Sequence, residues 1–453
     1  MNKSNTSPPI AVVILAAGKG TRMRSGRAKV LHEIAGQPML HWAMRSALTL
    51  DPHQIAVVVG HGGDEVAASA REVKPDVTIC QQPEQLGTGH AVRMAEDALT
   101  GFDGTLVVLF GDTPFLTPDT LSRLVDQPNA INVLGFRTET PDRYGRLVLE
   151  GENLHRIVEA KDASADELAI TACNSGVMAG PAPIMLGLLQ TLRAHNAQGE
   201  YYLTDLVALA RAGGVPARVV FCDEAETLGI NDRVDLARAE AAHQNRARHA
   251  ALLGGATLPA PETVHLAWDT RIGSDVVIEP NVVFAPGVTL HHGVTVRAFC
   301  HLADCEIAAG VSVGPFARLR GGSKIAEGAY IGNFVEMKNA DFGPGAKASH
   351  LTYVGDASVG REANLGAGTI TCNFDGAAKH RTEIGDRAFI GSNTLLIAPV
   401  CVGSDAYTAT GTVVTKDVPE GDLAIARVRQ ENKAGFGRKL RKRLVAAKKE
   451  RDS

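Results

Sequence analysis

The sequence predicts an α/β protein in three parts: a Rossmann-like, doubly wound domain, a linker helix and a parallel β-helix of hexapeptide repeats. Three observations predict it. Buried strands alternate with helix-forming segments in the first half, a helix pattern follows, and from Ile272 onward an aliphatic residue returns every six positions. We expect domains at 1–231 and 256–453, with the linker helix at 232–255.

The first half has the pattern of a parallel sheet. Ile10–Leu15, Ile55–Val59 and Leu106–Phe110 are apolar runs, and each is followed by Gly and then by a helix-forming segment. Such runs are typical of strands that are buried on both faces, and their alternation with helices favours a doubly wound sheet. The polar start, Met1–Pro9, and the short run Ile10–Ala17 do not resemble a secretion signal or a membrane span. We expect a cytoplasmic protein.

The linker helix is predicted by composition and by its two ends. Residues 232–253 are rich in Ala, Arg, Leu and Glu. Asn231 or Asp232 is a suitable N-cap, because its side chain accepts from the exposed N–H groups of a first turn. Gly254 and Gly255 then provide the stop.

The period of six is the strongest signal in the chain. Neither a helix nor an alternating strand repeats every six residues, whereas a prism with one short strand per face does, and its stacked coils bury an aliphatic column. Gly often follows the apolar residue, where the chain turns a corner. The period includes Ile272, Ile278, Phe284, Leu290, Val296, Leu302, then after a one-residue slip Ile307, Val313, Leu319, Ile325, Ile331, Met337, and finally Ile384, Ile390, Leu396 and Val402.

Composition excludes several other classes. The chain is 45% hydrophobic and 21% charged, which is ordinary for a globular protein. Its seven cysteines form no CxxC pair and no metal-finger spacing, which indicates reduced thiols. Residues 427–453 hold 11 Lys and Arg against 3 Asp and Glu but only one aromatic, Phe436. We interpret this tail as a solvated helix with basic residues near phosphate ligands, and expect neither nucleic-acid binding nor membrane insertion.

The loop after the first strand indicates phosphate binding. Leu15–Met23 reads LAAGKGTRM, in which Gly and Ala allow a ligand close to backbone N–H groups. Arg22 and Lys29 add the charge that a triphosphate requires. The spacing is neither the dinucleotide fingerprint nor the P-loop.

Together with further motifs, this loop resembles the family of nucleotidyltransferases that make sugar nucleotides from sugar 1-phosphates. With the β-helix, nearly the whole chain resembles the bacterial enzymes that combine N-acetylglucosamine-1-phosphate uridylyltransferase with glucosamine-1-phosphate N-acetyltransferase. The resemblance implies a left-handed β-helix and a product that supplies peptidoglycan and lipopolysaccharide precursors. The other motifs are Gln82 with Glu84–His90, Phe110–Asp112, Tyr144–Arg146, Ile157–Asp162, Asn174–Gly176, Asn196–Asp205 and Gly229–Asp232.

The resemblance implies roles for residues of the first domain. Asp112 and Asn231 are expected to hold Mg²⁺, because oxygen ligands suit this hard ion. Arg22 and Lys29 are expected to bind phosphate, Gln82 with Gly87 and Thr88 the uracil, and Gly145, Glu159 and Asn174 the sugar. The loop Leu15, Ala16, Ala17 and Gly18 and the segment Phe110 and Gly111 complete the predicted uridylyltransferase site.

The resemblance also implies a second site on the β-helix. His350 is the expected base for acetyl transfer from acetyl-CoA, because an imidazole titrates near neutrality. Arg318, Lys338, Tyr353 and Asn364 are expected to bind glucosamine 1-phosphate. The expected acetyl-CoA contacts are Ala367, Asn373, Phe374, Ser392, Thr410 and Arg427. The insertion Cys372–Thr382 breaks the period, and such breaks mark loops on the functional face.

Three positions depart from the family's pattern: Phe374 stands for a common Tyr, Thr410 for Ala and Phe436 for Trp. All three concern cofactor contacts and leave the base unchanged.

Two other classes share this layout. Glucose-1-phosphate adenylyltransferases use the β-helix only for regulation, and translation-factor exchange subunits are not enzymes. Lys338, His350 and Asn373 argue against the first reading, and Asp112 with Asn231 argues against the second. A narrow β-helix favours symmetric association, and the resemblance implies a homotrimer with acetyl-transfer sites between subunits.

Overall fold

The computed structural model describes residues 8–151, 153–196 and 198–452. Most of the polar start predicted at Met1–Pro9, and Ala197 of the Asn196–Asp205 motif, lie outside the described residues. The chain forms two compact units that divide between Ala247 and Arg248. Each unit is described by itself.

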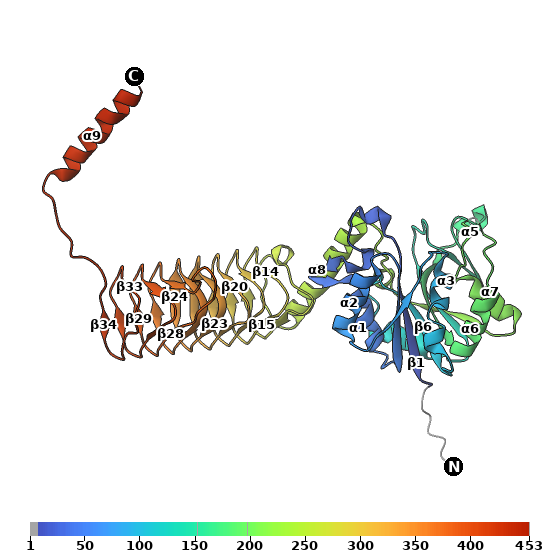
Figure 1. Ribbon diagram of the computed structural model, residues 1–453. Coiled ribbons are helices and arrows are strands. Elements are labelled where there is room, and N and C mark those ends of the chain that lie inside the picture. Colours follow the sequence, from blue (N-terminus) through green and yellow to red (C-terminus); the bar gives the residue numbers. More distant parts are fainter. Residues whose placement is uncertain (1–7, 152, 197, 453) are drawn as a thin grey trace, which may run out of the picture. The chain divides into compact units, whose positions relative to one another are not determined.

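The first unit contains a nine-stranded sheet with the order β5-β4-β1-β6-β10-β7-β11-β9-β8. Figure 1 labels two of these strands, β1 and β6. The three predicted strands are confirmed as β1, β4 and β6, which pair in parallel with β1 in the middle. The strand β10 runs antiparallel to β6 and β7. The bounds are β1 (Ile10–Ala16), β4 (Gln54–Val59), β5 (Thr78–Gln81), β6 (Thr105–Phe110), β7 (Ile131–Arg137), β8 (Arg146–Glu150), β9 (Asn153–Val158), β10 (Ala172–Pro181) and β11 (Ala217–Phe221), with a separate hairpin of β2 (Glu33–Ile34) and β3 (Gln37–Pro38).

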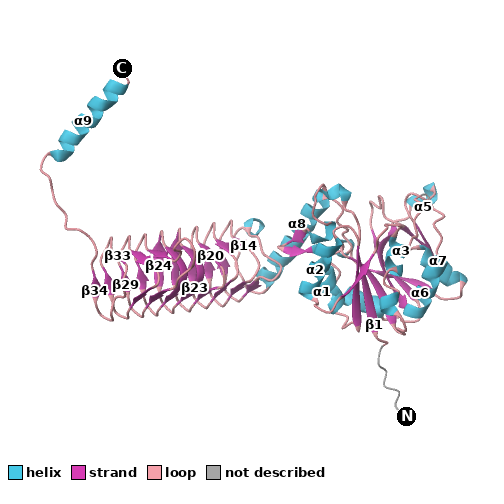
Figure 2. Cartoon of the chain, in the orientation of Figure 1, coloured by secondary structure: helices cyan, strands magenta, loops and turns pink. Residues whose placement is uncertain are grey.

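Helices cover both faces of this sheet (Figure 2). Alternate residues of β1 enter two different cores: Val13 packs in one and Ile14 in the other, and both are fully buried. This two-sided burial explains why β1 is apolar throughout. The helices are α1 (Met39–Leu48), α2 (Gly63–Val73), α3 (Thr88–Arg93), α4 (Pro118–Val125), α5 (Ala165–Leu168), α6 (Ala182–Thr191) and α7 (Asp205–Ala212).

A helix, α8 (Arg233–Leu253), lies within the range predicted for the linker. The carboxylate of Asp232 accepts from the N–H groups of Val234 at 2.9 Å and Asp235 at 3.0 Å, as expected of an N-cap. The part of α8 that belongs to the first unit packs on it. Glu240 accepts from the Ala35 N–H at 2.7 Å, and Ala239 is fully buried.

The second unit is a parallel β-helix of short strands. Ile272 pairs with Leu290, Leu290 with Ile307 and Ile307 with Ile325, one coil at a time. The strands are β12 (Arg271–Ile272), β13 (Val277–Ile278), β14 (Val283–Phe284), β15 (Val288–Leu290), β16 (Thr295–Val296), β17 (His301–Leu302), β18 (Cys305–Ile307), β19 (Ser312–Val313), β20 (Arg318–Arg320), β21 (Ser323–Ile325), β22 (Tyr330–Asn333), β23 (Glu336–Phe342), β24 (Lys347–His350), β25 (Tyr353–Val359), β26 (Asn364–Leu365), β27 (Ile370–Cys372), β28 (Thr382–Ile384), β29 (Phe389–Ile390), β30 (Leu395–Ile397), β31 (Val400–Val402), β32 (Tyr407–Thr408), β33 (Val413–Val414) and β34 (Leu423–Ala424).

The aliphatic period is the inward column of this β-helix. All its members except Ile272, in the first coil, are buried. The predicted fold class is therefore confirmed. The glycines that follow these residues are required mainly because the next coil passes close to them. A Cβ on Gly332 would overlap the Ser349 carbonyl and would lie only 2.6 Å from its carbon atom. Gly314 has, in addition to a close neighbour in Cys300, a φ of 97°.

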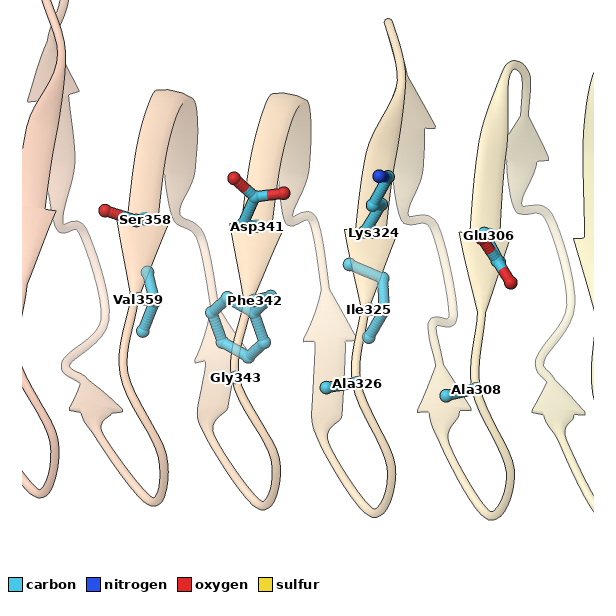
Figure 3. A pocket seen from close by; sticks show the side chains of 10 residues that line it. All are labelled: Glu306, Ala308, Lys324, Ile325, Ala326, Asp341, Phe342, Gly343, Ser358 and Val359. Carbon is cyan, nitrogen blue, oxygen red and sulfur yellow. The ribbon is translucent and has the colours of Figure 1, made fainter.

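The outer face carries charged side chains in register. Figure 3 shows Glu306, Lys324, Asp341 and Ser358 on successive coils, where Glu306 pairs with Lys324 and Lys324 with Asp341. They line a shallow pocket of about 350 Å³ that contains none of the predicted site residues. Opposite charges on neighbouring strands favour this register.

A C-terminal helix, α9 (Phe436–Arg451), has no buried residue. Within the described residues, no helix is both long and apolar enough to span a membrane. All seven cysteines are free thiols.

Candidate active sites

A pocket of about 220 Å³ lies at the carboxyl ends of the parallel strands of the first unit. The Gly111 N–H donates to the Leu15 carbonyl at 3.0 Å, which brings the segments after β6 and β1 together. In open α/β sheets this edge is where ligands bind. The predicted residues among its lining are Leu15, Ala16, Ala17, Gly18, Lys29, Gln82, Gly87, Thr88, Phe110 and Asp112, and the lining also includes Val30, Gln85, Ala91 and Glu200.

Gln82 is held in place by its own neighbours. Its side chain is buried and donates to the Gly87 carbonyl at 3.3 Å, and it lies 3.0 Å from His90 Nδ1. Gly87 has a φ of 107°, and a Cβ there would lie 2.7 Å from the Tyr201 carbonyl oxygen. Only glycine fits this position.

The two predicted metal ligands lie together, although they are far apart in sequence. The Ile230 N–H donates to the Asp112 carbonyl at 3.1 Å, which brings Asn231 to the end of β6. Arg22 donates to Asn231 Oδ1 at 2.8 Å, and the Lys29 ammonium contacts the Asp112 carboxylate. Two cations and two oxygen ligands therefore form one cluster.

These side chains fit a magnesium ion. Asp112 and Asn231 offer oxygen atoms only, and no cluster of three or more His, Cys, Asp or Glu suited to a metal occurs among the described residues. Mg²⁺ commonly takes one or two protein oxygens and completes its shell with water and substrate phosphates. A small donor set beside two cations therefore suits it.

The three predicted sugar-binding residues also lie close together. The Asn174 N–H donates to the Gly145 carbonyl at 2.8 Å, and a Cβ on Gly145 would lie 3.5 Å from the Glu159 carboxylate. Burial, the largest cause, raises the pKa of Glu159, while a hydrogen bond from Thr204 at 3.2 Å opposes the rise. A half-buried carboxylate with one neutral donor is suited to accept from sugar hydroxyl or amide groups.

Cations cluster on one outer face of the β-helix. Arg318, Glu336 and Tyr353 are in register on three successive coils, and Arg320 pairs with Lys338 beside them. Arg320 binds Glu336 at 2.7 Å, whereas Arg318 lies 3.6 Å from it. This face therefore brings together Arg318, Lys338 and Tyr353, three of the residues predicted to bind glucosamine 1-phosphate.

Two cations of this face were missed by the sequence analysis: Arg320 and Lys379. Lys379 lies against Lys338, and this contact is the largest cause that lowers the pKa of Lys338. The register of a repeat, in which outward residues two apart share one face, is a signal that could have identified Arg320. Lys379 lies in an insertion outside the register, so no periodicity indicates it.

His350 lies at a corner of the β-helix, at the end of β24. Its Nδ1 lies 2.6 Å from Asn333 Oδ1, one coil earlier. An amide oxygen only accepts, so Nδ1 carries the proton and Nε2 keeps a free lone pair. Asn333 was not predicted as a site residue.

The same corner continues through the residues predicted for acetyl-CoA. Backbone hydrogen bonds join Ala367 to Asn393 at 2.7 Å and Ser392 to Gly411 at 2.8 Å, and Arg427 donates to the Thr410 carbonyl at 2.6 Å. Ala367, Ser392, Thr410 and Arg427 are therefore brought together.

Asn364 precedes this corner on β26. Its strand belongs to the sheet of β24, while Arg318, Lys338 and Tyr353 lie on strands of the other sheet. Within one chain, Asn364 is thus separate from those three residues. Asn373 is buried and Phe374 is 59% exposed, both in the insertion.

Comparisons with known proteins identify relatives of both units. Residues 12–174 match the model of the MobA-like NTP transferase domain, and residues 269–303 match the bacterial transferase hexapeptide model of six repeats. A relative from a Ruegeria species, described as bifunctional protein GlmU, is 60% identical over 97% of this chain and 98% of its own length. Relatives of the same description from Ruegeria pomeroyi and Roseobacter denitrificans are 56% and 55% identical, each over 97% of this chain and 98% of their own length.

Proposed function

The chain belongs to the bifunctional GlmU family, and from this premise we propose how its residues divide two reactions. The enzyme acetylates glucosamine 1-phosphate with acetyl-CoA on the β-helix. It then transfers uridylyl from UTP to N-acetylglucosamine 1-phosphate in the first unit, with release of pyrophosphate. In this proposal residues 1–231 carry the uridylyltransferase site, residues 256–453 carry the acetyltransferase site, and residues 232–255 are the helix between them.

In uridylyl transfer, the sugar phosphate oxygen attacks the α-phosphorus of UTP. The requirement is mainly electrostatic, because negative charge increases on both sides of that phosphorus. Arg22 and Lys29 bind the phosphates, and the segment from Gln82 to Thr88 holds the uracil. Mg²⁺, bound by Asp112 and Asn231, supplies further positive charge there. Glu159 accepts from the sugar.

In acetyl transfer, the substrate amine attacks the thioester carbonyl, a C–N bond forms and the CoA thiolate leaves. His350 Nε2 takes the proton that the amine gives up. Asn333 supports this role, since its hydrogen bond at 2.6 Å keeps the proton of the neutral ring on Nδ1. The cationic face of Arg318, Arg320 and Lys338 is suited to the phosphate.

The single observation that carries the proposal is that each candidate site lies within its own compact unit, the Asp112 cluster before Ala247 and His350 after it. The test supplies glucosamine 1-phosphate, acetyl-CoA and UTP together and identifies the products. Wild type should make UDP-N-acetylglucosamine. Asp112→Ala should stop at N-acetylglucosamine 1-phosphate, and His350→Ala should make neither product unless N-acetylglucosamine 1-phosphate is added. Loss of both activities in either variant would contradict the division.

We further propose a cytoplasmic homotrimer. Phe299, Phe316 and Phe334 form an exposed stack at one corner, with ring centroids 5.0 and 5.1 Å apart, and each is about half exposed. Such apolar surface supports association. Sedimentation velocity should give three chains per particle, and Phe316→Glu should shift the particle to smaller species. A monomeric wild type would refute the trimer.

The free thiols support a location in a reducing compartment. Fractionation of cells tests that location.

A further inference from the structure

The insertion between β27 and β28 is a small hairpin. Phe374 pairs with Lys379 in an antiparallel bridge, and the His380 N–H donates to the Asn373 carbonyl at 2.9 Å. Gly376 at its tip has a φ of 101°. An isolated hairpin of this length is not stable by itself, so side-chain contacts must hold its shape.

Asp375 makes most of these contacts. Its Oδ1 accepts from the N–H groups of Ala377 at 2.8 Å and Ala378 at 2.7 Å. Its Oδ2 lies 2.6 Å from His380 Nε2, on the opposite side of the turn. The Ala378 N–H, followed by His380 and the Ala377 N–H, holds the pKa of Asp375 well below its usual range. One carboxylate therefore joins the tip of the hairpin to its returning strand.

The base of the hairpin is attached to the preceding coil. Asn373 donates to Asp356 at 2.5 Å, and Asp356 also accepts from Asn339 at 2.7 Å. Next to His380, Arg381 binds Asp341 at 2.7 Å. These contacts fix where the hairpin starts and ends, but not the path of the residues between.

The hairpin holds Lys379 in an unfavourable position. Asp356 accepts from Asn373 of the hairpin and from Asn339, the residue after Lys338, which brings the hairpin beside Lys338. Lys379 and Arg320 add positive charge at Lys338, and the Asp356 carboxylate opposes them. Like charges repel, so a free loop would move Lys379 away from Lys338. A dianionic phosphate reverses this balance, because two ammonium groups then share one anion. The contact between Asp375 and His380, next to Lys379 in the chain, can hold Lys379 there before the anion arrives.

We propose that Asp375 and His380 are positioning residues for acetyl transfer. Their contact locks the hairpin so that Lys379 stays beside Lys338 as a preformed receptor for the phosphate of the acceptor sugar, and so that Phe374 stays at the cofactor side. The inference rests on the proposed acetyltransferase function. Neither residue touches the reacting atoms: they act through Lys379.

The test compares His380→Leu, which removes the contact, with His380→Gln, which keeps a side-chain N–H donor for Asp375. Loss of one hydrogen bond to a charged group corresponds to about a tenfold change. His380→Leu should therefore raise KM for glucosamine 1-phosphate about tenfold with kcat changed less than about twofold, and His380→Gln should recover most of the loss. Asp375→Asn should also raise this KM.

The matched control is His291→Leu, which removes an exposed imidazole 2.9 Å from Glu306 on another part of the β-helix. It should leave both constants unchanged. Unchanged kinetics in His380→Leu, or equal loss in the Leu and Gln variants, would overturn the inference while wild-type acetyl transfer still supports the proposed function. A fall in kcat together with the melting temperature would assign His380 a structural role only, which also overturns it. Absence of acetyl transfer in wild type would instead refute the proposed function.

Discussion

Asn333 determines which nitrogen of His350 keeps a free lone pair. The amide oxygen accepts from Nδ1 at 2.6 Å, so the free lone pair is on Nε2. The same contact orients a ring that is otherwise exposed at the corner of the β-helix. A base that is correctly oriented before substrate arrives needs less reorganisation during the reaction.

We expect His350→Ala to lower kcat of acetyl transfer by about 10²–10⁴-fold, the usual contribution of a positioned base. Asn333→Leu should lower kcat by only about tenfold, since it removes one hydrogen bond and leaves the imidazole. CoA release measures both variants. Uridylyl transfer is the control, because neither side chain belongs to the first unit. A normal kcat in His350→Ala would leave His350 as a solvated surface residue.

Glu159 gives a prediction on pH. Burial raises its pKa in the folded state above its ordinary value of 4.5. The folded protein therefore favours the protonated carboxyl, and this contribution to stability is lost as pH rises through the folded pKa. Glu159→Gln should match wild type below pH 4.5 and should exceed its melting temperature increasingly above it. The variant should also bind N-acetylglucosamine 1-phosphate more weakly.

Thermal melts from about pH 4 to about pH 8, a range that begins near the usual pKa of a Glu carboxyl, check this prediction. Glu139→Gln, an exposed carboxylate of the same unit, is the control and should show no such trend. A constant difference between Glu159→Gln and wild type at all pH values would contradict a role for the buried charge.

At the scale of elements, the sequence predicted strands and coils better than contacts. The period of six follows directly from one inward residue per face, so the register was visible in the sequence. The reason why glycines follow the inward residues was not visible in the sequence. Several corners with positive φ carry Asp, Asn or Phe, as at Asp275 and Asn281, so a positive φ does not by itself require glycine. Gly332 is needed because the next coil passes too close for a Cβ. That distance exists only between stacked coils.

The same limit, that contacts between distant segments are not visible in the sequence, explains which residues of the candidate sites could be predicted. Motifs after strands predicted the pocket of the first unit, because the strand ends of a parallel sheet meet at one edge. Lys379 and Asn333 could not be predicted, since their partners Lys338 and His350 are one or more coils away and nothing in the local sequence indicates the contact.

Two glycine substitutions separate these roles. Gly332→Ala places a Cβ against the Ser349 carbonyl, and such overpacking costs about 1–3 kcal/mol. The β-helix should melt lower by about 2–4 °C for each kcal/mol, and acetyl transfer should fall because Asn333 is adjacent. Gly328→Asn should be tolerated, because this position has a φ of 67° with open space around it and Asn accepts that conformation. Equal stability of both variants would contradict the close-approach explanation.

At the scale of the whole chain, α8 is more than a connection. Arg233 donates to the Met23 carbonyl at 3.3 Å, Trp42 packs edge-on to His243 at 5.2 Å, and Arg246 lies 4.0 Å over the ring of Phe115. These contacts extend along the helix to the end of the first compact unit at Ala247. A boundary at residue 231, as the sequence suggested, would therefore remove part of the surface that stabilises the first unit.

Truncation tests where the first unit ends. A fragment of residues 1–247 should fold and convert N-acetylglucosamine 1-phosphate and UTP to UDP-N-acetylglucosamine at close to the wild-type rate, with no acetyl transfer. A fragment of residues 1–231 should retain Asp112 and Asn231 but melt at a lower temperature, because it exposes Trp42 and Phe115, which α8 covers with His243 and Arg246. Each buried aromatic contact of this kind contributes about 0.5–1.5 kcal/mol. Pyrophosphate release and thermal melting measure the two properties separately. If both fragments melt alike, the helix contributes nothing to the first unit; if the longer one is folded but inactive, the assignment of the Asp112 cluster is wrong.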